Sequence, residues 1–130
     1  MPSRAPDAVF EEATSESQAL MYRISGDYNP LHIDPEFPGV AGGGFRAPIL
    51  HGLCTMGFGA RAVLKCCADN EPEALRAMGV RFASPVIPGE TLVTSMWREG
   101  GRVLFQTDNK ETGKVCLSNG WAELQPSAKL

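Results

Sequence analysis

The feature that most constrains the fold is an apolar face that repeats along residues 49–68. Apolar side chains recur there at steps of three and four: Ile49, Leu53, Met56, Ala60, Val63, Leu64 and Cys67. This spacing predicts a helix that buries one face. The small residues Gly57, Gly59 and Ala60 lie in the middle of the stretch, so we expect another element to pack closely against it.

Strand-like segments follow this predicted helix, separated by turn signals that contain glycine. Their bounds are residues 77–86, 91–98, 102–109 and 114–124. We expect the last three to form an antiparallel meander, and a short strand at 9–14 and a helix ending near residue 25 to come first. The layout predicts an α+β fold in which an antiparallel sheet wraps around a central helix. Because such a sheet has open edges, a homodimer with a continuous sheet is expected.

Size and composition exclude several classes of protein. The chain has 130 residues, and this length predicts a single domain over 1–130. We expect flexible ends at 1–7 and 125–130. The net charge of −3 leaves no basic footprint for nucleic acid. No apolar run approaches the roughly 20 residues of a membrane span, so we expect no membrane association. The four cysteines suggest neither a disulfide framework nor a zinc site, and we interpret them as buried thiols in a reducing compartment.

Candidate chemistry begins in residues 27–48, a proline- and glycine-rich stretch that predicts a long loop. Asp27, Asn29 and His32 lie close together at its start, and His32 is one of only two histidines in the chain. An acid and an imidazole that face one small space suit proton transfer. The alternative is that Asp27 or Asn29 only caps the following turn, with Pro30 at its first position.

The second candidate is the start of the predicted central helix, at His51 and Gly52. Free backbone N–H groups and the positive end of the helix dipole meet there, so Gly52 could approach a developing oxyanion without a side chain in the way. The alternative is an ordinary helix start that binds nothing. A pairing of Cys54 as nucleophile with His51 as base is a weaker reading than a buried thiol.

Three segments resemble one known family. They are residues 22–35 (YRISGDYNPLHIDP), 48–55 (PILHGLCT) and 80–92 (VRFASPVIPGETL). Together they resemble the MaoC-like, (R)-specific type-2 enoyl-CoA hydratases, and most of all the hydratase part of peroxisomal multifunctional β-oxidation enzymes. The resemblance runs in order from about residue 7 to residue 124 and implies a hot-dog fold.

The resemblance also implies roles for particular residues. Asp27 and His32 match the catalytic dyad, Asn29 its supporting polar residue, and Gly52 the backbone donor to the thioester oxygen. Neighbours within the same motifs are expected to contact the substrate: Tyr28, Pro30, Leu31, His51 and Phe82. No metal is implied, and no cofactor beyond the CoA that the substrate carries. Arg46, Arg61, Arg81 and Arg98 are open candidates for contacts with the CoA phosphates.

The implied reaction is the reversible hydration of trans-2-enoyl-CoA to (R)-3-hydroxyacyl-CoA in fatty-acid β-oxidation. Eukaryotic members carry two such units in one chain. If two copies of this chain form a dimer instead, we expect two equivalent sites and a preference for short or medium acyl chains. Alternatives are an acyl-thioesterase or acyl-carrier-protein dehydratase on the same fold, or a non-catalytic acyl-CoA-binding or dimerisation module. The sequence ends in Ala128, Lys129 and Leu130, which differ from a C-terminal peroxisomal targeting signal by one residue. This predicts a peroxisomal location. If the three residues are not such a signal, we expect a cytoplasmic location.

Overall fold

One antiparallel sheet of five strands forms the body of the protein. The structure is a computed structural model that describes residues 1–126, apart from the side chain of residue 38. The strand order is β1-β3-β4-β5-β2, and every neighbouring pair is antiparallel. Their bounds are β1 Ala8–Ala13, β2 Leu75–Phe82, β3 Thr91–Glu99, β4 Arg102–Asn109 and β5 Val115–Leu124. The predicted meander of the last three strands is therefore confirmed.

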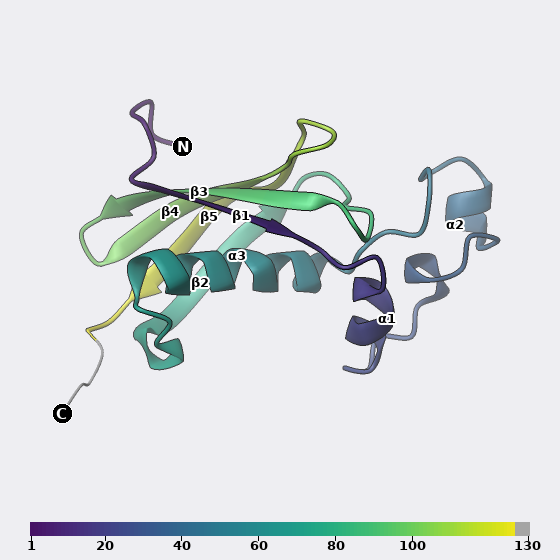
Figure 1. Ribbon diagram of the computed structural model, residues 1–130, viewed down its shortest axis with the longest axis horizontal. Helices are drawn as coiled ribbons and strands as arrows, with labels where there is room; N and C mark the ends of the chain where they lie inside the picture. The colour runs from purple at the N-terminus through teal and green to yellow at the C-terminus, as the bar shows by residue number, and fades with distance from the viewer. Residues whose placement is uncertain (127–130) are drawn as a thin grey trace.

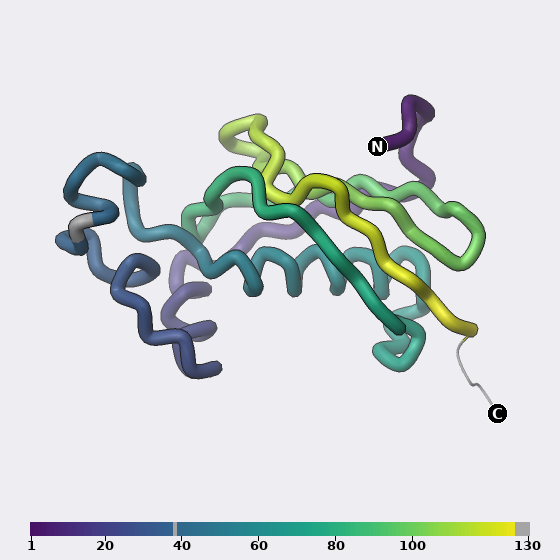
Figure 2. Tube along the Cα trace, turned by 180° about the vertical axis from the view of Figure 1, so that it is seen from behind, coloured from purple at the N-terminus to yellow at the C-terminus, as the bar shows by residue number. Residues whose placement is uncertain are grey.

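The central helix α3 (Gly52–Cys67) lies along one face of this sheet (Figure 1). Seen from behind, β2 and β5 run side by side across the helix (Figure 2). Ala62 and Val63 of α3 are buried with Met96, Phe105 and other strand residues in the main core. This α+β arrangement of a sheet around a helix is confirmed, and it is that of a hot-dog fold.

Small residues in α3 let the sheet approach, as the sequence predicts. A Cβ added at Gly59 would lie 3.1 Å from the Phe105 ring and 3.2 Å from Leu117. Gly57 is different, because a Cβ there would meet nothing within 4 Å. The sheet therefore approaches α3 closely at Gly59 and not at Gly57.

The ends of two predicted elements are displaced in the structure. The central helix begins at Gly52 rather than at residue 49, because the chain before it is extended and Leu50 N donates to Val86 O at 2.7 Å. The strand expected over 77–86 ends at Phe82 instead. Pro85, which has no N–H to offer a ladder, follows shortly after that end. Both displacements leave irregular backbone beside the N-terminus of α3.

Short helices make up most of the remaining chain. α1 (Gln18–Arg23), η1 (Pro30–His32) and α2 (Pro38–Ala41) extend beyond the end of the sheet near the start of α3 (Figure 1), and η2 (Pro72–Ala74) precedes β2. The long loop expected over 27–48 thus contains two short helices. Within residues 1–126, no helix has the length and apolar character needed to cross a membrane.

Candidate active site

Two neighbouring cavities open at the N-terminal end of α3, and they share three lining residues, His32, Gly52 and Phe82. The first, which we call the polar cavity, has a volume of about 300 Å³ and is also lined by Asp27 and by His51. The second, the apolar cavity, has a volume of about 250 Å³. The shared residues mark the place where polar groups and an apolar chain could meet.

Asp27 reaches the polar cavity from the turn after α1. Its Oδ1 accepts a hydrogen bond from Asn29 N at 3.1 Å, which closes the turn, while the side chain stays half exposed. Asn29 Oδ1 in turn accepts from Leu31 N at 3.1 Å and caps η1, with Pro30 at the first helical position. The capping alternative is thus realised for Asn29, whereas Asp27 closes the preceding turn through Asn29 N and also faces the cavity.

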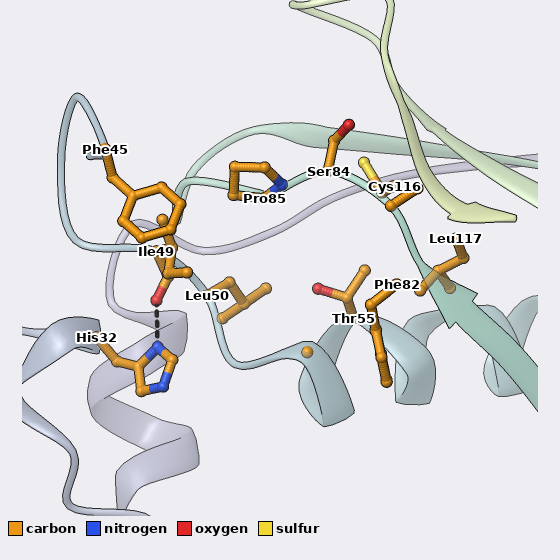
Figure 3. A pocket seen from close by; sticks show the side chains of 12 residues that line it. His32, Phe45, Ile49, Leu50, Thr55, Phe82, Ser84, Pro85, Cys116 and Leu117 are labelled. Atoms are coloured by element: carbon orange, nitrogen blue, oxygen red, sulfur yellow. Dashed lines mark hydrogen bonds between the residues drawn. The ribbon is translucent and has the colours of Figure 1, made fainter. Parts of the chain in front are cut away.

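His32 ends η1 and is held by the chain that leads into α3. Its Nδ1 lies 2.7 Å from Ile49 O, as the dashed line in Figure 3 shows. A carbonyl can only accept, so Nδ1 carries a proton and proton exchange is left to Nε2. A side-chain ligand atom of Asp27 and one of His32 lie within 4.8 Å of each other. One water molecule can bridge that separation with two ordinary hydrogen bonds.

His51 packs against the ring of His32, and only 2% of His51 is exposed. The two rings stack with centroids 3.8 Å apart and planes 26° apart, and Tyr22 contacts His51 at 4.6 Å between ring centroids. His51 Nε2 lies 3.4 Å from Asp27 O and 3.9 Å from Asp27 Oδ2. Burial, and secondly the nearby His32, lower the pKa of His51, so the ring is favoured in its neutral form.

Gly52 is the first residue of α3, and its amide has no partner inside the helix. The backbone there is exposed and lies beside Phe82, whose ring atoms would be 3.2 Å from a Cβ added at Gly52. Phe82 is 52% exposed at the end of β2. Gly52 thus lines both cavities at the start of a helix, where backbone amides lack helical acceptors, and it lies next to the exposed Phe82 ring.

The apolar cavity extends away from His32 between the long loop, α3 and two strands (Figure 3). Besides the three shared residues, its lining is Phe45, Ile49, Leu50, Thr55, Ala83, Ser84, Pro85, Cys116 and Leu117. Most of these side chains are apolar, so the cavity suits a hydrocarbon chain.

Five of the predicted site residues come together at this place: Asp27, His32, His51, Gly52 and Phe82. The other four do not line either cavity in the described structure. These are Tyr28, which is 62% exposed under the Arg23 guanidinium, Asn29, Pro30 and Leu31. They shape the turn that joins Asp27 to His32.

Several residues that line the apolar cavity were not predicted from the sequence. Thr55 lies one helical turn beyond His51, and this spacing could have identified it. Phe45 stands out as an aromatic residue in the predicted loop. Cys116 and Leu117 carry no such signal, because only the pairing of β5 with β2 brings them to the cavity.

Asp27, His32 and His51 are also the residues that could hold a metal ion, since each offers one ligand atom and these atoms lie within 4.8 Å of one another. The two imidazoles are also stacked on each other, with ring centroids 3.8 Å apart. His32 Nδ1 is already occupied by Ile49 O. The His32 ring therefore has only Nε2 left to offer an ion or a water molecule.

Other candidates have different roles. Burial raises the pKa of the Cys54 thiol, which makes a thiolate nucleophile beside His51 unfavourable. Cys54 and Cys116 are buried as expected, whereas Cys66 and Cys67 are only half-buried, and all four are free. Three of the candidate arginines have partners: Arg46 pairs with Glu90, Arg61 pairs with Glu12, and Arg98 Nη2 donates to Cys66 O at 2.7 Å.

Fold and site together define a class, a hot-dog domain in which a carboxylate and an imidazole face a free helix amide at the end of an apolar cavity. Within that class the family is settled by sequence. The profile of the MaoC like domain matches residues 1–119, and the chain belongs to this family.

The relatives are longer proteins. The chain is 57% identical over 128 residues to the peroxisomal multifunctional enzyme type 2 of Mus musculus, with 98% of this chain and 17% of that protein covered. It is 52% identical over 125 residues to the peroxisomal enoyl-CoA hydratase 2 of Arabidopsis thaliana, with 96% and 40% covered. The solved structure of the full-length peroxisomal multifunctional enzyme type 2 from Drosophila melanogaster matches with a TM-score of 0.91 at 52% identity, over 96% of this chain and 23% of that one. The chain thus spans less than half the length of each of these relatives.

Proposed function

We propose that this protein catalyses the reversible hydration of trans-2-enoyl-CoA to (R)-3-hydroxyacyl-CoA. The observation that carries the proposal is the approach of Asp27 and His32 within 4.8 Å, on a cavity that also contains Gly52. The names of relatives, among them an enoyl-CoA hydratase 2, agree with this reaction.

In the proposed reaction, water bound between Asp27 and His32 attacks the β carbon of the substrate. The new O–C bond forms as the Cα=Cβ bond breaks, and the electron pair moves onto the thioester oxygen as an enolate. The dyad accepts a proton from the water and delivers a proton to the α carbon, which restores the carbonyl. Asp27 and His32 face the same water molecule in this scheme, so we assign the roles of acid and base to the dyad as a whole.

The Gly52 amide stabilises the enolate. It lies at the positive end of the 16-residue helix α3 and needs no reorganisation to donate. Removal of one such donor typically lowers kcat by about 10²–10³-fold. General acid–base help from the dyad contributes about 10²–10⁴-fold more.

The acyl chain would occupy the apolar cavity. Apolar lining residues such as Phe45 and Leu117 would contact this chain, and the cavity volume of about 250 Å³ favours short or medium acyl chains. No cofactor other than the CoA of the substrate enters this reaction scheme.

A second copy of this chain is the proposed partner. Large apolar side chains are exposed on α1 and beside the site, at Leu20, Met21, Ile24 and Leu53, with exposed fractions of 56–82%. β2 lies at one edge of the sheet, where a partner strand could pair. Burying these groups in a homodimer would close the cavities from one side.

A peroxisomal location is also part of the proposal. It is supported by the relatives named peroxisomal. The suggested address at Ala128, Lys129 and Leu130 lies outside the described residues.

Crotonyl-CoA tests the function directly. We expect loss of the alkene absorbance and an (R)-configured product with wild type, and loss of that activity in Asp27→Asn and His32→Gln. Release of free thiol from acyl-CoA would instead identify a thioesterase. Acyl-CoA binding without turnover would identify a binding module, and a fully active monomer in size-exclusion chromatography would contradict the dimer.

A further inference from the structure

His51 is the one histidine that the proposed reaction does not use, yet it is the more deeply buried of the two. Its ring is enclosed by His32 on one face and Tyr22 on another side. At 2% exposure it leaves little surface for a substrate to contact. His51 lines the polar cavity as well, and its burial against His32 suggests a second role beside the expected substrate contact.

The surroundings of the ring select one tautomer. Both oxygens near Nε2 belong to Asp27, the carbonyl at 3.4 Å and the carboxylate Oδ2 at 3.9 Å. Oxygens of this kind only accept hydrogen bonds, so a bare Nε2 would set lone pair against lone pair. Nε2 therefore carries the proton. Nδ1 is buried and has no hydrogen-bond partner in the described part of the chain.

The same surroundings keep the ring neutral. A proton on Nδ1 would be an N–H donor with no acceptor, and the cation would lie 3.8 Å from the His32 ring centroid. The titratable and charged groups that face His51 are Asp27, His32, Tyr22 and Arg23. Of these, only Asp27 favours the protonated ring, whereas burial, His32 and Arg23 oppose it.

We propose that His51 is a positioning residue, whose neutral, Nε2-protonated ring holds Asp27 in place against His32. Donation to the carbonyl of Asp27 fixes the turn that carries the carboxylate. Stacking on His32 keeps that imidazole in the plane set by its bond to Ile49 O. The proposal rests on the proposed function only for its kinetic consequence, since the tautomer itself can be observed without turnover.

Nitrogen NMR of histidine-labelled protein tests the tautomer, and the spectrum is simple because the chain has two histidines. We expect His51 to carry its proton on Nε2 and to be less protonated at pH 6.5 than a free imidazole, which is half protonated there. We expect His32 to carry its proton on Nδ1. A proton on Nδ1 of His51, or titration of His51 at the ordinary value, would overturn the proposal even if the enzyme is active.

Two variants test the kinetic consequence. His51→Phe keeps a stacking ring but removes the donor, whereas His51→Gln keeps an N–H at a similar position without the ring. We expect His51→Phe to lower kcat about 10–100-fold with KM changed less than about twofold, because a misplaced group slows the chemical step. His51→Gln should recover most of that loss. Equal losses in both variants, or a wild-type kcat in His51→Phe, would overturn the positioning role.

The two experiments separate this inference from the proposed function. If the wild type does not hydrate crotonyl-CoA, the function fails, and the NMR result alone decides the role of His51. If His51→Phe does not fold, as measured by circular dichroism, the NMR result and His51→Gln still decide it.

Discussion

Substitution of Gly52 by alanine probes the proposed oxyanion donor. The added Cβ would lie 3.2 Å from Cδ1 and from Cε1 of Phe82, closer than the roughly 3.5–4.0 Å that carbon atoms prefer. Phe82 is 52% exposed and free to turn toward solvent, so the contact costs little folding energy. The variant keeps the backbone N–H, but its methyl group adds bulk next to the amide that we assign to the thioester oxygen, in the cavities that Gly52 lines.

The expected effects on folding and on catalysis therefore differ greatly in size. Alanine is favoured over glycine in helices by at most about 1 kcal/mol, which offsets the close contact, so the free energy of unfolding should change by less than about 1 kcal/mol. A methyl group that keeps the thioester oxygen from this amide should lower kcat about 10²–10³-fold, the effect of losing one oxyanion donor, which corresponds to about 2.7–4 kcal/mol.

Gly57→Ala is the matched control on the same helix, because a Cβ there meets nothing within 4 Å. It should keep the wild-type kcat for crotonyl-CoA and raise the melting temperature slightly. A wild-type kcat in Gly52→Ala would refute the oxyanion assignment. Recovery of activity in the double variant Gly52→Ala/Phe82→Leu would show that displaced Phe82, and not a blocked amide, caused the loss.

Two further predictions concern the buried polar groups. Glu90→Ala should destabilise the fold by about 2 kcal/mol in urea denaturation, because it leaves the side-chain amide of Asn109, which is 0% exposed, without its acceptor at 2.6 Å. Glu123→Ala, which removes an exposed pair with Arg102, should cost less than about 1 kcal/mol, and equal losses would contradict the reasoning. Burial raises the pKa of Cys116 from 9.0 to about 12, so the unfolded chain loses this proton first and the free energy of unfolding should fall as pH rises from 9 toward 12. Cys116→Ala should flatten that slope, and an unchanged slope would exclude Cys116 as its cause.

The layout of the fold could be predicted from local sequence patterns. The three- and four-residue repeat identified α3, and its small residues anticipated the close contact that Gly59 makes with Phe105. The bounds could not be predicted as well. Whether residues 49–51 continue the helix depends on the bond from Leu50 N to Val86 O, a contact between segments far apart in the chain.

The candidate site was predictable only in part for the same reason. Asp27 and His32 lie within one short motif, so their proximity follows from local turns capped by Asn29. The sequence did not predict that the His51 ring stacks on His32, because that contact depends on how the long loop folds back onto the start of α3. Tertiary packing of this kind leaves no periodic signal in the sequence.

The most direct test of the central claim is a double-mutant cycle on crotonyl-CoA hydration with Asp27→Asn, His32→Gln and both together. If the two groups act on one water molecule, each single variant should lose most of the activity, and the double variant should lose little more than the worse single one. Losses that multiply in the double variant, or a single variant with wild-type kcat, would contradict a shared water at Asp27 and His32.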